Sequence, residues 1–246
     1  MKTLLVTGAS RGVGFEICKQ AAVEGHKVIT LSRNITPLKG MQNIHPFAVD
    51  LSIESALVDF VEEIKTSFRS IDVLINNAGG APLINSLDAS MNFNNAIIDL
   101  NLNSSFAVSY YVAKKMIKKS SGCVITNISS VTATRPTPGS AAYGAAKGGL
   151  VNLTKTLAVE WAPRIRVNSI ITGYIETENS LVHYGSKKDM KPVAKTIPMQ
   201  RMGTPEDIAN ACLFLSSVNS SWITGTAIEV HGGGESPTYL DLAKPK

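Results

Sequence analysis

A glycine-rich segment between an apolar β-branched run and an amphipathic stretch constrains the fold of this chain more than any other feature. Gly8, Gly12 and Gly14 follow the run Thr3–Thr7, and a helical pattern begins at Gly12. Glycines let backbone N–H groups approach a pyrophosphate, and the N-terminus of the following helix supplies unpaired donors and a positive dipole end. The spacing G-x3-G-x-G departs from the general G-x-G-x-x-G fingerprint. A phosphate-binding turn and an ordinary glycine-rich connection both fit this segment alone.

Short β-branched runs alternate with longer amphipathic stretches along the chain, a pattern typical of βαβ units around a buried parallel sheet. With 246 residues, 44% of them hydrophobic, and no linker or change of composition, the whole chain is predicted to form one domain. The expected fold is α/β, a Rossmann-like, doubly wound parallel sheet of about seven strands with helices on both faces. The predicted strands are Thr3–Thr7, Lys27–Leu31, Ile44–Val49, Val73–Asn76, Cys123–Ile128, Arg166–Ile171 and Ala227–Val230, and the predicted helices include Gly12–Glu24, Ile53–Phe68, Asn92–Lys119, Ala141–Trp161 and Pro205–Ser216.

Composition and spacing argue against several other classes of protein. The 24 basic and 19 acidic residues leave a formal charge of +5, and the basic residues are dispersed rather than interleaved with aromatic ones, which argues against nucleic-acid binding. Cys18, Cys123 and Cys212 are odd in number and far apart, so neither a disulfide framework nor a zinc motif is expected. The histidines are scattered, and no apolar run approaches the roughly 18 residues of a membrane span. We therefore expect a cytoplasmic protein without a metal site or membrane segment.

The segment Glu176–Pro198 is rich in polar residues and lacks clean periodicity. Because it lies between a predicted strand and the last helix–strand unit, it fits either a surface loop or a lid over the substrate. We expect a substrate lid at residues 176–198.

The end of the second predicted strand bears on the choice of cofactor. An acidic residue at this place would bind the ribose 2′-hydroxyl of NAD, but the chain has Ser32 and Arg33 there. Arg33, together with Arg11 in the glycine loop, is suited to charge-assisted bonds with a 2′-phosphate. The alternative is that Arg33 only faces solvent. The pattern favours NADP(H) over NAD(H).

Tyr143 and Lys147 are four residues apart in a predicted helix, so their side chains share one face. A free tyrosine has a pKa near 10, and a neighbouring ammonium favours its phenolate form. Tyr143 is therefore a candidate general acid/base. The pair alone is common among surface helices, and its interpretation depends on the motifs around it.

Several motifs in order make the chain resemble the short-chain dehydrogenase/reductase family, and especially its 3-oxoacyl-(acyl-carrier-protein) reductases. Thr7–Gly14 matches the T-G-x3-G-x-G loop, and Asn76–Gly79 matches the N-N-A-G turn. Ser130, thirteen residues before Tyr143, matches the serine that orients the substrate, and we prefer it to Ser129 on that spacing. By resemblance, the proton-transfer residues are Asn101, Ser130, Tyr143 and Lys147, and the cofactor-binding residues are Gly8, Ser10, Arg11, Gly12, Val13, Gly14, Ser32, Arg33, Asp50, Leu51, Asn77, Ala78, Gly79, Tyr143, Lys147, Gly173, Ile175 and Thr177.

The resemblance implies hydride transfer between nicotinamide and a substrate carbonyl carbon. Tyr143 would exchange a proton with the oxygen, and Ser130 would bind that oxygen. Lys147 would bind the nicotinamide ribose and lower the pKa of Tyr143, and Asn101 would hold a water in the proton relay. The chain departs from the family at Thr172-Gly173, where Pro-Gly is usual, and loss of proline is expected to loosen that turn.

The substrate stays open at this stage. Reduction of a 3-oxoacyl thioester is one hypothesis, oxidoreduction of a sugar, polyol or other secondary alcohol is another, and a non-catalytic NADP-sensing protein is a third. An acyl carrier protein would need basic residues near the cleft, for which Lys118, Lys119 and Arg164 are candidates. The family resemblance also implies a homotetramer, with the long helices Asn92–Lys119 and Ala141–Trp161 in the main contact.

Overall fold

A computed structural model, which describes residues 1–118 and 122–235, contains a seven-stranded sheet in which every strand pair is parallel. The strand order is β3-β2-β1-β4-β5-β6-β7. The order reverses at β1, which lies between β2 and β4, so a crevice opens at the carboxyl ends of β1 and β4. The strands are β1 (Thr3–Thr7), β2 (Lys27–Ser32), β3 (Ile44–Ala48), β4 (Val73–Asn76), β5 (Cys123–Ser130), β6 (Ile165–Thr172) and β7 (Ala227–Val230).

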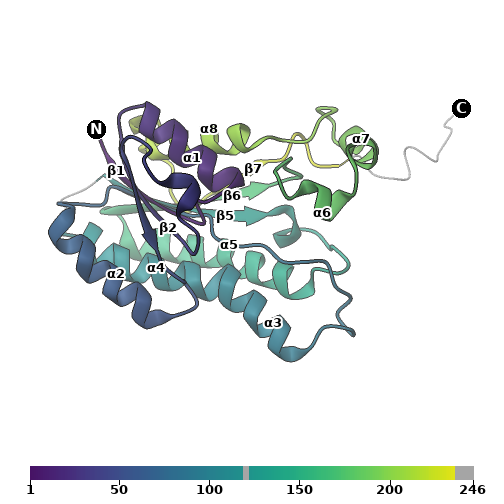
Figure 1. Cartoon of the computed structure of the whole chain (residues 1–246), viewed down its shortest axis with the longest axis horizontal. Coiled ribbons are helices and arrows are strands. Elements are labelled where there is room, and N and C mark those ends of the chain that lie inside the picture. The colour runs from purple at the N-terminus through teal and green to yellow at the C-terminus, as the bar shows by residue number, and fades with distance from the viewer. Residues whose placement is uncertain (119–121, 236–246) are drawn as a thin grey trace, which may run out of the picture.

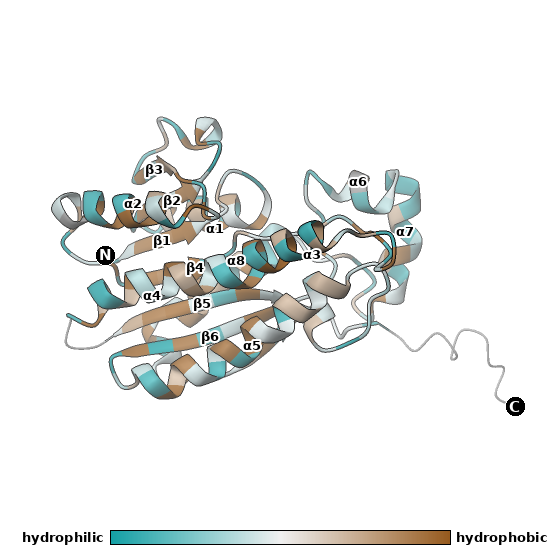
Figure 2. Ribbon diagram, turned by 90° about the horizontal axis from the view of Figure 1, so that it is seen from below, coloured by the Kyte–Doolittle hydropathy of each residue, from teal (hydrophilic) through white to brown (hydrophobic). Residues whose placement is uncertain are grey.

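Helices cover both faces of this sheet, as Figure 1 shows, and the predicted α/β fold is confirmed. Side chains alternate between the faces along each strand, so Leu4 and Val6 pack in one apolar cluster while Leu5 packs in the other. Figure 2 shows the resulting apolar strands between helices with polar outer faces. The helices are α1 (Gly12–Val23), α2 (Glu54–Ser67), α3 (Met91–Ile98), α4 (Ser104–Met116), α5 (Ala141–Trp161), α6 (Ser180–Tyr184), α7 (Lys187–Thr196) and α8 (Pro205–Ser216).

The long helix predicted over Asn92–Lys119 is interrupted. It consists of α3, a π-helical turn over Asp99–Asn103, and α4, which ends at Met116, whereas Lys119 lies outside the described residues. A π-helical turn inserts a residue into the helix and is common at functional sites. Here it carries Asn101, whose amide bonds to the backbone of Gly80. The spacing of apolar residues in the sequence does not indicate this π-helical turn.

The segment 176–198 is more regular than its composition indicated, because it contains α6 and α7. Ser186 and Asp189 form a capping box at the start of α7, in which each side chain accepts a hydrogen bond from the other residue's backbone N–H. The S-x-x-D pattern is a sequence signal for the start of a helix. Pro192, however, is unfavourable inside a helix, and the segment lacks clean helical periodicity. The segment is thus largely helical rather than an open loop.

In the described part of the chain, no helix combines the length and the apolar character needed to cross a membrane.

Candidate active site

The turns that follow β1 and β4 are tied together by hydrogen bonds. The Thr7 hydroxyl accepts hydrogen bonds from the backbone N–H groups of Asn77 and Ala78, both at 3.0 Å. The Asn77 amide in turn donates to the carbonyls of Thr7 and Gly8, both at 3.0 Å. These bonds fix the glycine loop against the carboxyl end of β4, where the strand order reverses.

Two glycines of this loop have no room for a side chain. A Cβ on Gly8 would lie 2.7 Å from the Ala78 Cα, and Gly8 has a φ of +66°. A Cβ on Gly14 would lie 2.5 Å from the Asn77 amide nitrogen. Gly12, with a φ of +54°, faces Thr177, whose methyl group would contact its Cβ at 3.5 Å. The backbone of the loop is therefore bare on the side that Thr177 approaches, as close approach of a pyrophosphate requires.

The charged residues expected at the adenosine end of the cofactor follow three neighbouring strands: Arg11 comes after β1, Arg33 after β2 and Asp50 after β3. Arg11 and Arg33 are exposed, and within the described residues neither guanidinium group forms a hydrogen bond or salt bridge. The Ser32 hydroxyl donates to the carbonyl of Asn34 at 2.9 Å. Two hydrogen bonds from Ser52 lower the pKa of Asp50, and the charge of Arg33 adds a smaller effect in the same direction. Both arginines are thus free to bind an anion.

The turn after β6 is held more firmly than the loss of proline suggested. The Thr172 hydroxyl donates to the carbonyl of Ser129 at 3.0 Å, which ties the end of β6 to β5. The Gly173 N–H donates to the carbonyl of Val230 at 3.2 Å. Thr172 thus gives this turn an anchor that proline lacks, and the expectation of a looser turn is not supported. Ile175 forms a bridge with Gly203.

Ser130, Tyr143 and Lys147 meet where β5 ends and α5 begins. Ser130 is the last residue of β5, and its hydroxyl forms a hydrogen bond with the Tyr143 hydroxyl. Burial raises the pKa of Tyr143 above its ordinary value, and the bond with Ser130 partly opposes this. The Lys147 Nζ lies 5.6 Å from the centre of the Tyr143 ring. A proton donor, an oxygen-binding hydroxyl and an ammonium group therefore share one site.

Lys147 is a buried cation, with 3% of its surface exposed. Its Nζ donates to the carbonyl of Ile128 at 2.9 Å. Burial lowers the pKa of the ammonium group from 10.5 to about 8. A Cβ on Gly79 would lie 3.1 Å from this Nζ and 2.6 Å from the Asn101 Oδ1, so glycine in the turn after β4 leaves space for both groups.

Asn101 is fully buried beside this ammonium group. Its Oδ1 accepts from the N–H of Gly80 at 2.8 Å, and its Nδ2 donates to the carbonyls of Gly80 and Ile97 at 3.0 and 2.9 Å. The structure thus shows a side chain that links the π-helical turn to the turn after β4.

The two neighbouring serines of β5 have different surroundings. The Ser129 hydroxyl donates to the backbone carbonyl of Lys147 at 3.1 Å, on the inner side of α5. Ser130 instead faces Tyr143, as its hydrogen bond to that residue shows. Ser129 therefore anchors the helix, and Ser130 is the serine that lies beside Tyr143.

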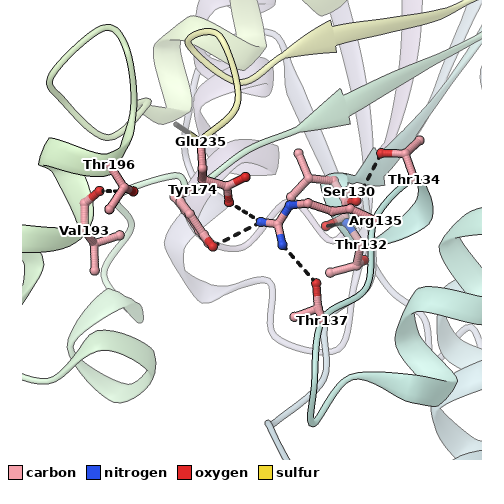
Figure 3. A network of polar contacts seen from close by, with 10 residues as sticks. Ser130, Thr132, Thr134, Arg135, Thr137, Tyr174, Val193, Thr196 and Glu235 are labelled. Carbon is pink, nitrogen blue, oxygen red and sulfur yellow. Dashed lines mark hydrogen bonds and ion pairs between the residues drawn. The ribbon is translucent and has the colours of Figure 1, made fainter. Parts of the chain in front are cut away.

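A group of polar residues beside this site was not found from the sequence. It consists of Arg135, Thr137, Tyr174 and Glu235, which come from the β5–α5 loop, the turn after β6 and the segment after β7 (Figure 3). The Tyr174 and Tyr184 rings meet edge to face at 5.9 Å. These residues are far apart in the sequence and carry no shared motif, so only the fold brings them together.

The basic residues expected at the cleft lie elsewhere. Arg164 immediately precedes β6, and Lys118 lies between α4 and β5, so both belong to the amino-terminal edge of the sheet. Lys118 lines a cavity of about 550 Å³ together with Arg69 of the α2–β4 connection and Lys115 of α4. Tyr143 lies at the opposite, carboxyl edge. The expectation for Lys118 and Arg164 is therefore wrong, and Lys119 lies outside the described residues.

Comparison with known proteins shows similarity over almost the whole chain. A family model described as enoyl-(acyl carrier protein) reductase matches residues 8–235. The 3-oxoacyl-[acyl-carrier-protein] reductase FabG of Buchnera aphidicola subsp. Schizaphis graminum is 38% identical over 244 residues, which cover 94% of this chain and 96% of that protein.

Solved structures of dehydrogenases share the fold. The ligand-free aldohexose dehydrogenase of Thermoplasma acidophilum has a TM-score of 0.88 and 33% identity, and the match covers 100% of this chain and 96% of that one. A 4-hydroxyisoleucine dehydrogenase complexed with NADH has a TM-score of 0.89 and 31% identity, covering 95% of this chain and 98% of that one.

The low pKa of Lys147 predicts a pH-dependent effect on stability that can be measured without any activity. The group binds its proton less tightly in the folded chain, where the pKa is about 8, than in the unfolded chain, where it is 10.5. The cost of the buried charge is therefore full below pH 8 and is relieved as pH rises towards 10.5, by up to about 3 kcal/mol. In urea titrations at several pH values in this range, the parent should gain stability relative to Lys147→Met. If the free energies of unfolding of the two proteins change with pH in the same way, the lowered pKa of a buried Lys147 is contradicted.

Proposed function

The chain belongs to the short-chain dehydrogenase/reductase family, and we propose that it reduces the ketone of a 3-oxoacyl thioester with NADPH. The observation that carries the proposal is the contact of Ser130 with Tyr143 beside the buried ammonium group of Lys147. This arrangement supplies a proton donor and an oxygen-binding group at one point of the cleft. The 3-oxoacyl substrate is proposed from the relative named as a 3-oxoacyl-[acyl-carrier-protein] reductase.

The residues around the glycine loop fit NADP(H). The bare backbone between Gly8 and Gly14 suits the pyrophosphate, together with Ser10 and Val13. Arg11 and Arg33 suit the 2′-phosphate, since both guanidinium groups are exposed and neither binds a carboxylate of the described residues. The same fit assigns the adenine to Asp50 and Leu51, the nicotinamide ribose to Tyr143 and Lys147, and the remaining contacts to Gly12, Ser32, Asn77, Ala78, Gly79, Gly173, Ile175 and Thr177.

In the proposed reaction, Tyr143 is the general acid. When bound, the nicotinamide cofactor supplies the hydride to the carbonyl carbon. Burial raises the pKa of Tyr143, so the hydroxyl remains protonated at neutral pH and can donate to the oxygen of the developing alkoxide. Ser130 donates a hydrogen bond to the same oxygen and holds it near Tyr143.

Lys147 stabilises the tyrosinate that remains after proton transfer. Its charge lies 5.6 Å from the ring, in a buried place where water screens it little. Asn101 keeps the turn after β4 in position beside this ammonium group. We assign Asn101 to the proton relay on the match with the family motif.

Oxidoreduction of a sugar or other polyol is the second candidate. It is favoured by the likeness to the aldohexose dehydrogenase of Thermoplasma acidophilum and by the polar group around Arg135 beside the site. The proton chemistry at Tyr143 is the same for both candidates, so they differ only in the substrate that the cleft accepts.

We further propose that residues 176–198 form a lid. Thr177 lies against Gly12 of the glycine loop, while Met190 of α7 packs in a small apolar cluster with Tyr174 and Tyr184. The segment therefore spans from the proposed cofactor site to the residues beside Tyr143, as a cover over both would.

A homotetramer is proposed from the surfaces of α4 and α5. Phe106 and Tyr110 of α4 are each 45% exposed, and Val159 of α5 is 82% exposed. Exposed apolar side chains on these two helices are typical of a contact between subunits.

Reduction of acetoacetyl-N-acetylcysteamine by NADPH tests the proposed function. The parent should oxidise NADPH in the presence of this thioester. Tyr143→Phe should retain its fold and cofactor binding and lose roughly 100-fold or more in kcat, because only the transferable proton is removed. Ser129→Ala is the matched control and should keep most of the activity. Equal kcat in parent and Tyr143→Phe would contradict the role of Tyr143.

The role of Arg33 predicts a preference for NADPH over NADH. Arg33→Ala should reduce this preference by about 10-fold or more, since a bond to a charged group contributes roughly 1.5–3 kcal/mol. Affinity for NADH should change little, which separates loss of the phosphate contact from general damage. A parent that prefers NADH would refute the assignment.

If the substrate arrives on an acidic carrier protein, the lysines of α7 should guide the encounter. Lys187, Lys188 and Lys191 are exposed on the proposed lid. Joint Lys187→Glu and Lys191→Glu should lower kcat/KM for a carrier-linked thioester by about 10-fold at low salt, and much less at 1 M salt, where the Debye length is about 3 Å. Turnover of the N-acetylcysteamine thioester should change little.

Lys118→Glu and Arg164→Glu are the matched controls for this experiment, because both residues lie at the opposite edge of the sheet. Equal losses with the α7 pair and with these controls would mean that only net charge matters. No loss in any variant would exclude steering of a carrier by α7.

A further inference from the structure

We propose that Arg135 binds a carboxylate at the end of the substrate remote from the thioester, and that Glu235 occupies this place in the ligand-free protein. The inference rests on the proposed function in that it assigns a substrate class to the same site. It follows from the position of Arg135, from its unused hydrogen-bond donor, and from the attachment of Glu235.

Arg135 lies in the loop that connects Ser130 to Tyr143, so both ends of its loop are residues of the proposed proton-transfer site. Its guanidinium group points toward Tyr174, the second residue after the end of β6 (Figure 3). Tyr184 links this group to the reacting end of the site: its ring contacts Tyr174 at 5.9 Å. Burial raises the pKa of Tyr184 to about 12, and the neighbouring Tyr174 and Tyr143 contribute to this shift. Arg135 thus bonds to Tyr174, whose ring contacts that of Tyr184, and lies in the loop that leads from Ser130 to Tyr143.

The guanidinium group does not use all its donors. Nη1 donates to the Thr137 hydroxyl at 3.2 Å, while Nη2 donates to the Tyr174 hydroxyl at 3.0 Å and to a Glu235 carboxylate oxygen. The Nε atom is shielded from solvent and has no hydrogen-bond partner among residues 1–118 and 122–235. Nε and Nη2 form the edge of a guanidinium group that binds a carboxylate through two parallel bonds. Glu235 reaches Nη2 but leaves Nε unpaired.

A purely structural ion pair would be expected to use both donors, because an unpaired buried donor costs about 1–3 kcal/mol. The unpaired Nε instead indicates a binding site for a carboxylate that can reach both Nε and Nη2, whereas Glu235 reaches only Nη2. The Tyr174 hydroxyl adds a further partner, since it bonds both Arg135 and Glu235. A ligand carboxylate at this place would therefore bind the guanidinium group of Arg135 and the hydroxyl of Tyr174.

Glu235 is attached in a way that permits it to leave. It follows Gly232, Gly233 and Gly234, whose φ values of +68°, +97° and +81° are in the region that favours glycine. Its side chain is 23% exposed and that of Arg135 is 32% exposed, so the pair borders solvent. The Gly232 carbonyl is held by a hydrogen bond from the Met199 N–H, so the rotation that releases Arg135 would occur at Gly234, beside Glu235, and would not move β7. The Glu235 carboxylate therefore neutralises Arg135 until a substrate carboxylate replaces it.

Two matched pairs of ketones test the proposal. The first pair is 3-oxoadipyl-N-acetylcysteamine and its methyl ester, and the second is 4-oxopentanoate and its methyl ester. In both pairs the carboxylate has the same spacing from the ketone, and only the first pair contains a thioester. The parent should favour the carboxylate over the ester by about 10-fold or more in kcat/KM in each pair.

Arg135→Gln should abolish this carboxylate-to-ester ratio. Glu235→Gln should raise kcat/KM for the carboxylates, because it removes the competing group and leaves Arg135 in place. If thermal melting shows that Arg135→Gln does not fold, the kcat/KM of Glu235→Gln for the carboxylates tests the proposal instead, and an unchanged value would overturn it. Arg164→Gln, an exposed arginine at the opposite edge of the sheet, is the control and should leave the ratio unchanged.

The outcomes separate this inference from the proposed function. Turnover of 4-oxopentanoate without turnover of either thioester would refute the 3-oxoacyl substrate and leave the role of Arg135 supported. Equal turnover of carboxylate and ester by the parent, or an unchanged ratio in Arg135→Gln, would overturn the role of Arg135. Turnover of neither pair would overturn the role of Arg135, whereas the proposed function is decided by turnover of acetoacetyl-N-acetylcysteamine.

Discussion

A buried ammonium group is the constraint on which the arrangement of the site depends. Lys147 Nζ is removed from water and donates to the carbonyl of Ile128, so its surroundings must accept a charge that burial disfavours. Gly79 leaves space for it, and Asn101 lies beside the same glycine. The turn after β4, the π-helical turn and the start of α5 are therefore fixed relative to one another around one cation.

The same constraint links stability to function. A lysine with a pKa of about 8 costs the folded chain stability at neutral pH, yet the proposed reaction uses the charged form of this lysine. A buried polar network beneath the site helps to keep the frame rigid. The Asn76 amide donates to Asn127 at 2.8 Å, and Asn127 donates to Thr154 of α5 at 2.9 Å. The helix that carries Tyr143 and Lys147 is thereby tied to β4 and β5.

Local patterns in the sequence predicted the strands and the motif residues of the site. The β-branched runs gave the seven strands within a few residues, and the motifs selected Ser130, Tyr143 and Lys147, which the fold brings together. The sequence did not show contacts made only by the fold. The π-helical turn at Asn101 is stabilised by Gly80, far away in the chain, and Arg135 meets Glu235 only because β5 and β7 are both bonded to β6. The expectation for Arg164 failed for a different reason: it rested on charge alone, although a residue just before a strand lies at the amino-terminal edge of a parallel sheet.

The central claim is that Ser130 and Tyr143 act as one unit on a single substrate oxygen. A double-mutant cycle in kcat/KM, with Ser130→Ala, Tyr143→Phe and the double variant, measures this coupling directly. Because either single change disables the unit, the double variant should be within about threefold of the slower single variant. Losses that multiply would show that the two residues act independently, and would contradict the account.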